Sequence, residues 1–244
     1  MKVGGRSRVW KDDLTGGFTA LGLNPGIKVI VHSSLSSFGY VVGGAETVID
    51  ALMEVITSEG TLMMPTFNHG TPFRFGGPGY FDPKETPTSN GAIPEAFWHR
   101  SGVFRSLNPT HPFAAWGEGA QRYVADHHRR LTMGPESPLG LLCSDGGYTL
   151  LLGVDYTSNT FHHVVEMSTG APCLGRRTEA YPVRRPDGRK VMGRTWGWRA
   201  NPCPFTDQDR YADRMVSFHR QMTLGDAVAT LYRLRDGFDV VSEI

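Results

Sequence analysis

Two histidines and a glutamate follow a turn crowded with polar side chains, between residues 153 and 166. On a helix, His163 and Glu166 stand at positions i and i+3 and share a face with Thr160. A carboxylate beside an imidazole raises its basicity and fixes its tautomer, which suits a general base. The spacing alone more often belongs to a structural histidine with an acidic neighbour, so it does not by itself establish a catalytic pair.

A second polar group is the turn from Ser33 to Ser37, which leads into a glycine-rich loop ending at Gly43 and Gly44. Such turns expose backbone N–H groups and hydroxyls near a helix N-terminus, where phosphates and amides bind. The stretch is neither a phosphate loop with Gly-Lys-Ser/Thr nor a G-x-G-x-x-G sequence. A loop that merely connects a strand to a helix is an equally good interpretation.

A third polar segment runs from Arg105 to Gly117 and contains Asn108, Thr110 and His111 between prolines. A turn held by prolines can present such side chains rigidly into a cleft. On the sequence alone, a purely structural turn is the better interpretation.

The elements that must position these residues are typical of an α/β protein. A strand, a glycine-rich loop, a helix and a second strand between residues 28 and 67 form a βαβ unit, which predicts parallel strands. In open α/β sheets, ligands bind at the carboxyl ends of the strands. Hydrophobic periodicity predicts strands at 28–32, 61–67, 113–116 and 148–154, and helices at 45–56, 92–100, 118–130, 137–143 and 159–168.

The pattern changes beyond residue 172. Short β-like runs at 179–183 and 190–192 surround the turn Pro186-Asp-Gly188, and a Thr-x-x-Asp start predicts a final helix at 223–235. The predicted fold is α/β, with a mixed, largely parallel central sheet flanked by helices and a C-terminal β-containing appendage. We expect a core at 1–172 and a C-terminal portion at 173–244 that packs on it in one continuous domain.

The bulk composition narrows the function classes. A chain of 244 residues with a net charge of +1 has no overall field to recruit nucleic acid or an anionic membrane. Neither a signal peptide nor a membrane span is evident, so we expect a cytoplasmic protein. The three cysteines, at 143, 173 and 203, form no C-x-x-C pair; we predict reduced thiols and no metal site.

Several blocks of the chain, in a fixed order over residues 28–170, resemble the aminoglycoside 3-N-acetyltransferase family. Each block is weak alone, and together they are highly specific. The blocks are Val31-His-Ser-Ser-Leu-Ser-Ser-Phe-Gly39, Val42-Gly-Gly44, Met64-Pro-Thr-Phe67, Phe81-Asp-Pro83, Thr86-Pro87, Gly91-Ala-Ile-Pro-Glu95, Arg105-Ser106, Pro109-Thr-His111, Ser137-Pro-Leu139, Leu151-Leu-Gly-Val154, Ser158-Asn-Thr160, His163 and Glu166.

The resemblance implies acetyl-CoA as donor and an amino group of an antibiotic or related small molecule as acceptor. It implies that His163 is the general base, that Glu166 orients it, and that Thr160 helps to hold the reacting centre. The expected acceptor contacts are Asn68, Glu95, Asp155 and Asn159. The expected acetyl-CoA contacts are His32, Ser33, Ser34, Leu35, Ser36, Ser37, Gly39, Val42, Gly43, Gly44, Thr66, Phe67, Arg105, Thr110 and His111.

The chain departs from the family pattern in two regions. Asn108 stands where the family commonly has histidine, and Pro112 where serine is common. Members that act on polycationic aminoglycosides carry an acidic C-terminal portion, whereas this one is basic. Its cations are Arg176, Arg177, Arg184, Arg185, Arg189, Lys190, Arg194 and Arg199, against Glu179 and Asp187.

Three functions stay open at this point. The first is acetylation of an aminoglycoside by a monomer or homodimer that needs no macromolecular partner. The second is a biosynthetic N-acyltransferase for a different, anionic amine, because a basic wall repels a polycation and attracts a carboxylate or phosphate. The third is a catalytically silent CoA-binding protein, which need not keep Thr160, His163 and Glu166 together. The basic segment is also compatible with binding of the CoA 3′-phosphate or with an ordinary solvated surface.

Overall fold

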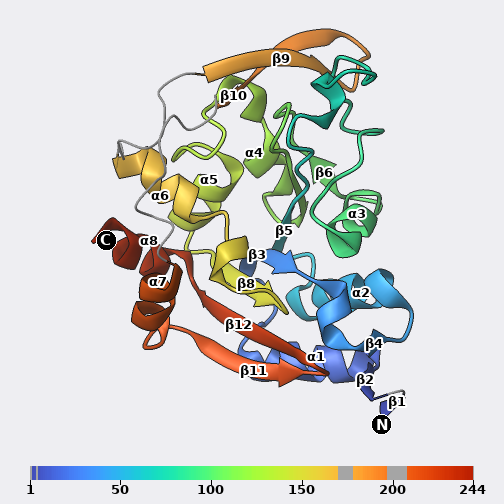
Figure 1. Ribbon diagram of the computed structural model, residues 1–244, viewed down its shortest axis with the longest axis vertical. Coiled ribbons are helices and arrows are strands. Elements are labelled where there is room, and N and C mark those ends of the chain that lie inside the picture. The colour runs from blue at the N-terminus through green and yellow to red at the C-terminus, as the bar shows by residue number, and fades with distance from the viewer. Residues whose placement is uncertain (1, 4, 170–177, 197–207, 244) are drawn as a thin grey trace.

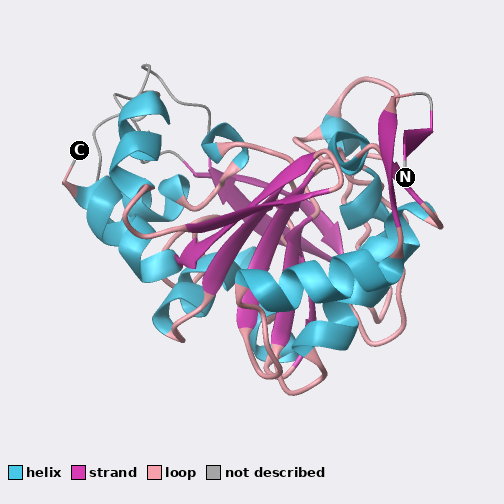
Figure 2. Ribbon diagram, turned by 90° about the horizontal axis from the view of Figure 1, so that it is seen from below, coloured by secondary structure: helices cyan, strands magenta, loops and turns pink. Residues whose placement is uncertain are grey.

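A computed structural model describes residues 2–3, 5–169, 178–196 and 208–243. Arg176, Arg177 and Arg199 of the basic segment, together with Cys173 and Cys203, lie outside the described residues. The fold has a twisted central sheet with helices on both of its faces (Figure 2). The seven strands lie in the order β11 (Arg220–Leu224), β12 (Ala227–Arg233), β8 (Tyr148–Leu152), β3 (Lys28–Ser33), β5 (Thr61–Pro65), β7 (Phe113–Gly117) and β6 (Phe104–Arg105).

The centre of the sheet is parallel and its flanks are antiparallel. Strand β3 pairs in parallel with both β5 and β8, which confirms the predicted βαβ unit. The other four pairings of this sheet are antiparallel. The fold class, a mixed α/β sheet flanked by helices, is confirmed.

Two hydrophobic cores lie on opposite faces of the sheet. Along β3, Val29 and Val31 face one core and Ile30 faces the other, because successive strand residues alternate between faces. The first core is covered by α1 (Lys11–Leu21), α2 (Gly44–Ile56) and α3 (Ala92–Trp98). The second core is covered by α4 (Ala120–Val124), α5 (Pro138–Ser144), α6 (His162–Thr169), α7 (Gln208–Met215) and α8 (Leu234–Ser242).

The predicted helix at 223–235 is wrong. Those residues form the end of β11, a turn and β12, and the following helix α8 begins only at Leu234. Gly225 has φ +64°, which supplies the turn, and Asp226 accepts hydrogen bonds from the N–H and the hydroxyl of Ser7. The Thr-x-x-Asp pattern therefore marks a hairpin anchored by a distant serine. Pairing of β12 with β8 outweighs the local capping signal.

The predicted helix at 118–130 is broken into two pieces. Helix α4 ends at Val124, Asp126 adopts a left-handed conformation with φ +54°, and a 3-10 turn follows at His127–Arg129. Helix α1 was not predicted. Within the described residues, no helix has the length and hydropathy needed to cross a bilayer.

Two small sheets stand apart from the central one (Figure 1). The first contains β1 (Lys2–Val3), β2 (Arg6–Val9) and β4 (Tyr40–Val41) and lies beside α2. The second is a hairpin of β9 (Thr178–Arg184) and β10 (Lys190–Trp196), which confirms the turn predicted at residues 186–188. The hairpin is tied to the loop after β5, because Phe81 forms a β-bridge with Val183.

Candidate active site

The segments that carry the candidate catalytic and binding residues meet at one end of the strands of the central sheet, here called the sheet edge. The carboxyl ends of the parallel strands β3, β5 and β8 lie at this edge, as the pairing register requires. The antiparallel strands β7 and β12 begin there, so the turns before Phe113 and Ala227 join the same edge. Contacts between these loops therefore depend on the order of strands in the sheet.

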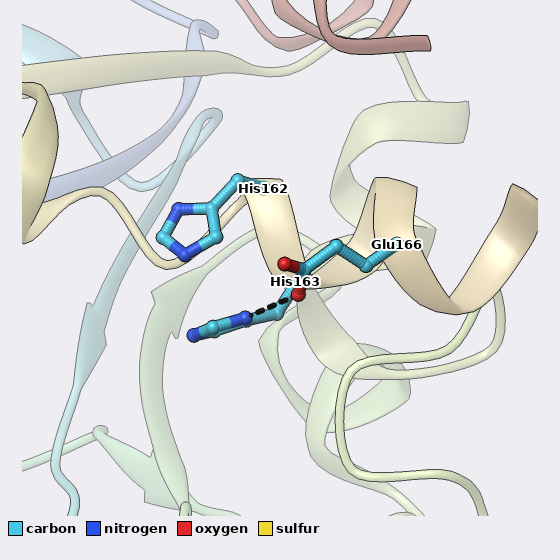
Figure 3. A group of neighbouring side chains, drawn as sticks. All are labelled: His162, His163 and Glu166. Atoms are coloured by element: carbon cyan, nitrogen blue, oxygen red, sulfur yellow. Dashed lines mark hydrogen bonds and ion pairs between the residues drawn. The ribbon is translucent and has the colours of Figure 1, made fainter. Parts of the chain in front are cut away.

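Helix α6 carries the imidazole–carboxylate pair (Figure 3). The Nδ1 atom of His163 lies 2.7 Å from Oε2 of Glu166, and the carboxylate of Glu166 points at the ring. The Glu166 side chain is fully buried, whereas 18% of the His163 side chain is exposed. A carboxylate beside Nδ1 favours the tautomer that has its proton on this nitrogen, so Nε2 is the basic nitrogen of the neutral ring.

The start of α6 is held by a fully buried asparagine. The Oδ1 atom of Asn159 accepts the N–H of Phe161 at 3.1 Å, and its Nδ2 donates to the hydroxyl of Tyr232 at 2.6 Å. Asn159 was expected to contact the acceptor. Both ends of its amide are engaged within the protein, and its contact with an acceptor stays a prediction.

His162 lies directly beside the pair. Its ring centroid is 4.0 Å from that of His163, and one ligand atom each from His162, His163 and Glu166 lies within 4.8 Å of the others. These three residues are the described group that could hold a metal ion. The absence of a metal site from this protein stays a prediction.

His32 lies at the end of β3, between the serine-rich turn that follows it in sequence and His162 on α6. It follows Ile30 on the same face of β3, and therefore faces the core that α6 covers. Burial, together with the nearby His162, lowers the pKa of His32 to about 3. Its Nε2 is buried and has no hydrogen-bond partner among the described residues, and the same is true of the hydroxyls of Ser33 and Thr160. Three buried polar atoms at this edge thus have capacity for a ligand.

The proline-held turn supplies a third histidine. Burial and the proximity of His69 and His163 hold the pKa of His111 well below its usual value, so this ring is neutral. The hydroxyl of Thr110 lies 2.7 Å from Nδ1 of His111. Phe67 packs edge-on against His111, with ring centroids 4.9 Å apart.

Asn108 has a structural part in this turn. It is fully buried, and its Oδ1 accepts the backbone N–H groups of Thr110 and His111 at 3.2 and 2.9 Å. Its Nδ2 donates to the carbonyl of Arg194 on β10 at 3.1 Å. An amide thus fixes the His111 turn against the basic hairpin at the position where the family commonly has histidine.

The serine-rich turn lines a pocket of about 700 Å³. Its walls come from residues 33–36, 39–41 and 44 on one side and 89–92 on the other. The lining residues that the sequence did not predict are Tyr40, Val41, Ser89, Asn90, Gly91 and Ala92. Ser37 donates to the carbonyl of Gly153 at 2.8 Å, and the N–H of Ser34 donates to that of Leu152. These bonds join the turn to the loop that leads into α6.

A second hollow, of about 620 Å³, lies on the other side of Ser34. Asp155 lines it, as do Gln221, Asp226 and Thr230 from the β11–β12 hairpin. The carboxylate of Asp155 accepts the N–H of Thr157 at 3.0 Å. Of the expected acceptor contacts, Asp155 is therefore the one that opens onto this hollow, while Asn68 lines a separate pocket of about 460 Å³ beside Thr71.

Two expected contacts are engaged elsewhere. The Arg105 guanidinium donates to both oxygens of Thr66 and to the carbonyl of Thr86, which straps the loop after β5 in place. Burial lowers the pKa of Arg105 to about 10. Glu95 accepts the N–H of Thr88 at 2.7 Å and lies 3.3 Å from Nε2 of His99.

His69 and His162 were not assigned from the sequence, although each stands in or beside a block that resembles the family. Their signal was proximity in sequence: His69 follows Phe67 by two residues, and His162 precedes His163. Only the fold shows that both lie near the candidate base or near His111.

Gly39 has a backbone conformation that a side chain would strain. Its φ of +92° is outside the range of most residues, and a Cβ atom would stand 2.6 Å from the Ser7 carbonyl and 2.7 Å from the Asp226 carboxylate. We therefore expect Gly39→Ala to lower the free energy of unfolding by about 1–3 kcal/mol and to weaken CoA binding. Urea denaturation and calorimetric CoA titration check this. The exposed Gly76→Ala, which has a similar φ of +84° and open space around it, tests for backbone strain alone; equal effects of the two variants would contradict the role of crowding.

Comparison with known proteins gives one consistent result. A family model described as aminoglycoside 3-N-acetyltransferase matches residues 30–244. A Bacillus subtilis prophage-derived aminoglycoside N(3′)-acetyltransferase-like protein, YokD, is 38% identical over 190 residues, which cover 67% of this chain and 70% of that protein. Aminoglycoside N(3)-acetyltransferase VII of Streptomyces paromomycinus is 38% identical over 207 residues, with 78% and 69% covered. The crystal structure of aminoglycoside acetyltransferase AAC(3)-Xa superposes with a TM-score of 0.84 at 27% identity, over 97% of this chain and 92% of that one.

Proposed function

Because this chain belongs to the aminoglycoside 3-N-acetyltransferase family, we propose that it moves the acetyl group of acetyl-CoA to an amino group of an aminoglycoside-type compound. Family membership makes it an acetyl-CoA-dependent N-acetyltransferase; the acceptor and the residue roles are the proposal. The observation that supports these roles most directly is the His163–Glu166 pair at 2.7 Å. It lies beside His162 and His111 at the sheet edge that also carries the serine-rich turn.

The residues present fit acetyl-CoA. The pocket along the turn offers hydroxyls and glycine backbone at its walls, which suits a ligand rich in amides and phosphates. Ser33 lines this pocket, and its buried hydroxyl lacks a partner among the described residues; the same holds for Nε2 of the neighbouring His32, which faces the core that α6 covers. Polar atoms that are buried and unbonded carry a cost, which a polar ligand removes.

His163 acts on the acceptor. Its Nε2 takes the proton of the attacking ammonium or amine, while Glu166 accepts the Nδ1–H and stabilises the imidazolium that forms. Bound acetyl-CoA supplies an activated acetyl group, and its transfer releases CoA as the thiol. The Thr160 hydroxyl, buried near the start of α6, is available to donate to an oxygen on which negative charge develops.

The loops around His163 hold the two substrates in place. The Ser37–Gly153 bond and the Asn159 cap fix the turn and α6 relative to each other. Holding two reactants in the reactive orientation raises the rate of such transfers by several orders of magnitude. Burial lowers the pKa of His111, so this ring, held by Phe67 and Thr110, adds no positive charge near His163.

One observation favours a second acceptor class, an anionic amine. The hairpin β9–β10 packs against the His111 turn through the Asn108–Arg194 bond and a contact between the Thr110 and Thr195 hydroxyls at 2.5 Å. Its described cations are Arg184, Arg185, Arg189, Lys190 and Arg194. Among the described residues, Arg184 is paired with Asp82 and Arg189 with Asp187. The five cations of the hairpin outnumber its two carboxylates, Glu179 and Asp187. A positive surface near the site repels a polycation.

Purified protein incubated with acetyl-CoA and a panel of amines separates these functions. We expect release of CoA thiol and an acetyl mass increment with an aminoglycoside such as a gentamicin- or kanamycin-type compound. Turnover only of amines that carry a carboxylate or phosphate would support the second acceptor class. Binding of CoA by calorimetry, without product from any amine, would overturn both and leave a silent binding protein.

A further inference from the structure

An arginine between two aromatic rings stands at the outer rim of the pocket along the serine-rich turn. Arg8 on β2 is the register partner of Tyr40 on β4. Its guanidinium carbon lies 4.8 Å from the ring centroid of Trp10 and 5.7 Å from that of Tyr40. Trp10 is 50% exposed and Tyr40 is 55% exposed, and Tyr40 also lines the pocket.

The Arg8 guanidinium has no hydrogen bond to any of the described residues. Its Nε is buried and has no hydrogen-bond partner, and Arg8 forms no ion pair with a carboxylate within the described ranges of the chain. Leaving a buried donor of a charged group unbonded is costly. A guanidinium presents a fork of donors that matches a phosphate, and its face stacks on aromatic rings.

The small sheet holds this arginine in place. The N–H and hydroxyl of Ser7 bond to Asp226 at 3.0 and 2.5 Å, which ties β2 to the β11–β12 turn. The N–H of Trp10 donates to Asp13 at 2.8 Å and fixes the start of α1. The Arg8, Trp10 and Tyr40 group, here called the rim site, is therefore organised before any ligand arrives.

We propose that the rim site binds the nucleotide end of acetyl-CoA, with the Arg8 guanidinium on the 3′-phosphate and the adenine against the exposed ring of Tyr40. The assignment rests on the proposed function, which places the acetyl end of the donor beside His163 on α6. Figure 1 shows β2 and β4 beside α2, on the opposite side of β3 from α6. The part of the donor remote from its thioester is the nucleotide, and it carries the anionic and aromatic groups that these side chains recognise.

The test compares acetyl-CoA with 3′-dephospho-acetyl-CoA in the full chain. We expect Arg8→Gln to raise KM for acetyl-CoA about tenfold, the effect of one lost charge-assisted hydrogen bond, and to leave KM for the dephospho donor within about twofold. Arg6→Gln is the matched control, because it removes the same charge from the same strand. We expect both of its KM values to stay near those of the parent. Tyr40→Ala should weaken both donors to a similar extent, because stacking on adenine does not involve the 3′-phosphate.

Calorimetric binding of CoA and 3′-dephospho-CoA gives the same comparison without turnover. A preference for CoA that disappears in Arg8→Gln supports the rim site even if no amine is acetylated, in which case only the proposed function fails. Equal loss for both ligands in Arg8→Gln, or no loss for either, overturns the phosphate contact. An equal effect of Arg6→Gln would show that general charge, and not the rim site, attracts the donor.

Discussion

Replacement of His163 by asparagine is expected to lower kcat by at least about 100-fold, because a positioned general base typically contributes 10²–10⁴ in rate. CoA affinity should stay near that of the parent, since the pocket of about 700 Å³ is lined by residues of the serine-rich turn and by residues 89–92. Steady-state kinetics with the best acceptor of the panel, together with calorimetry for CoA, measures the two effects separately. If the His163→Asn variant acetylates the acceptor at the rate of the parent protein, His163 is not the general base.

The neighbouring imidazole provides a matched control for this prediction. His162 lies one residue away on the same helix, with its ring centroid 4.0 Å from that of His163. If His163 is the base, His162→Asn should retain most of the turnover. Equal losses in the two variants would indicate that removal of either ring disturbs α6.

The buried carboxylate gives a further readout of the same mechanism. Glu166→Gln keeps the shape of the side chain and removes the charge that stabilises the imidazolium, so kcat should fall less than in the His163 variant. The acid limb of the pH profile of kcat should also move to lower pH, because the His163 imidazole becomes less basic without the neighbouring carboxylate. A purely structural role for Glu166 would lower activity by the same factor at every pH.

Acidification from pH 7 to pH 5 is expected to destabilise the fold through histidines that are buried in the neutral form. Burial lowers the pKa of His127 to about 4. Its Nε2 lies 2.9 Å from the carbonyl of Thr132 and its Nδ1 lies 2.9 Å from the Ser106 hydroxyl. In the unfolded chain this histidine has an ordinary pKa of about 6.5, so it is protonated between pH 7 and pH 5. In the folded protein it stays largely neutral over the same range.

The sign and size of the effect follow from proton linkage. Stability from a depressed histidine pKa is fully present above about pH 6.5 and is lost as pH falls toward the folded pKa near 4. His127 alone should lower the free energy of unfolding by roughly 2 kcal/mol at pH 5 relative to pH 7. His32, whose pKa is lowered to about 3, acts in the same direction.

Urea denaturation at the two pH values checks this prediction in the parent and in His127→Gln. Glutamine retains a donor and an acceptor and does not titrate, so the variant should be less stable at pH 7 but should lose less on acidification. An unaltered slope in His127→Gln would contradict the linkage.

Those parts of the candidate site whose residues are close together in the sequence could be predicted from the sequence. His163 and Glu166 are one helical turn apart, so a helix brings them together whatever the rest of the fold does. The serine-rich turn follows a strand, and α2 follows its glycines, as the periodicity predicts. The blocks that resemble the family also carried the donor and the enzyme class, which the family relationship confirms.

Contacts between distant segments were not predictable in the same way. The Thr-x-x-Asp pattern predicted a helix, yet β12 pairs with β8 and Asp226 binds Ser7, 219 positions away along the chain. The expected ligand contacts at Asn159 and Arg105 came from the resemblance to the family, which does not say which protein groups these side chains bond. In the fold, Asn159 bonds to Phe161 and Tyr232, and Arg105 bonds to the loop after β5; a ligand contact stays a prediction for both.

Motif order and short-range periodicity were enough to identify the family, most of the local elements, and the spacing of the imidazole and its carboxylate. The proximity of His32 and His111 to the two histidines of α6, and of Arg8 to Trp10 and Tyr40, depends on the fold. The physical reason is that strand order at the sheet edge chooses which loops meet. That order is set by pairing and burial summed over the whole chain, and no single segment encodes it.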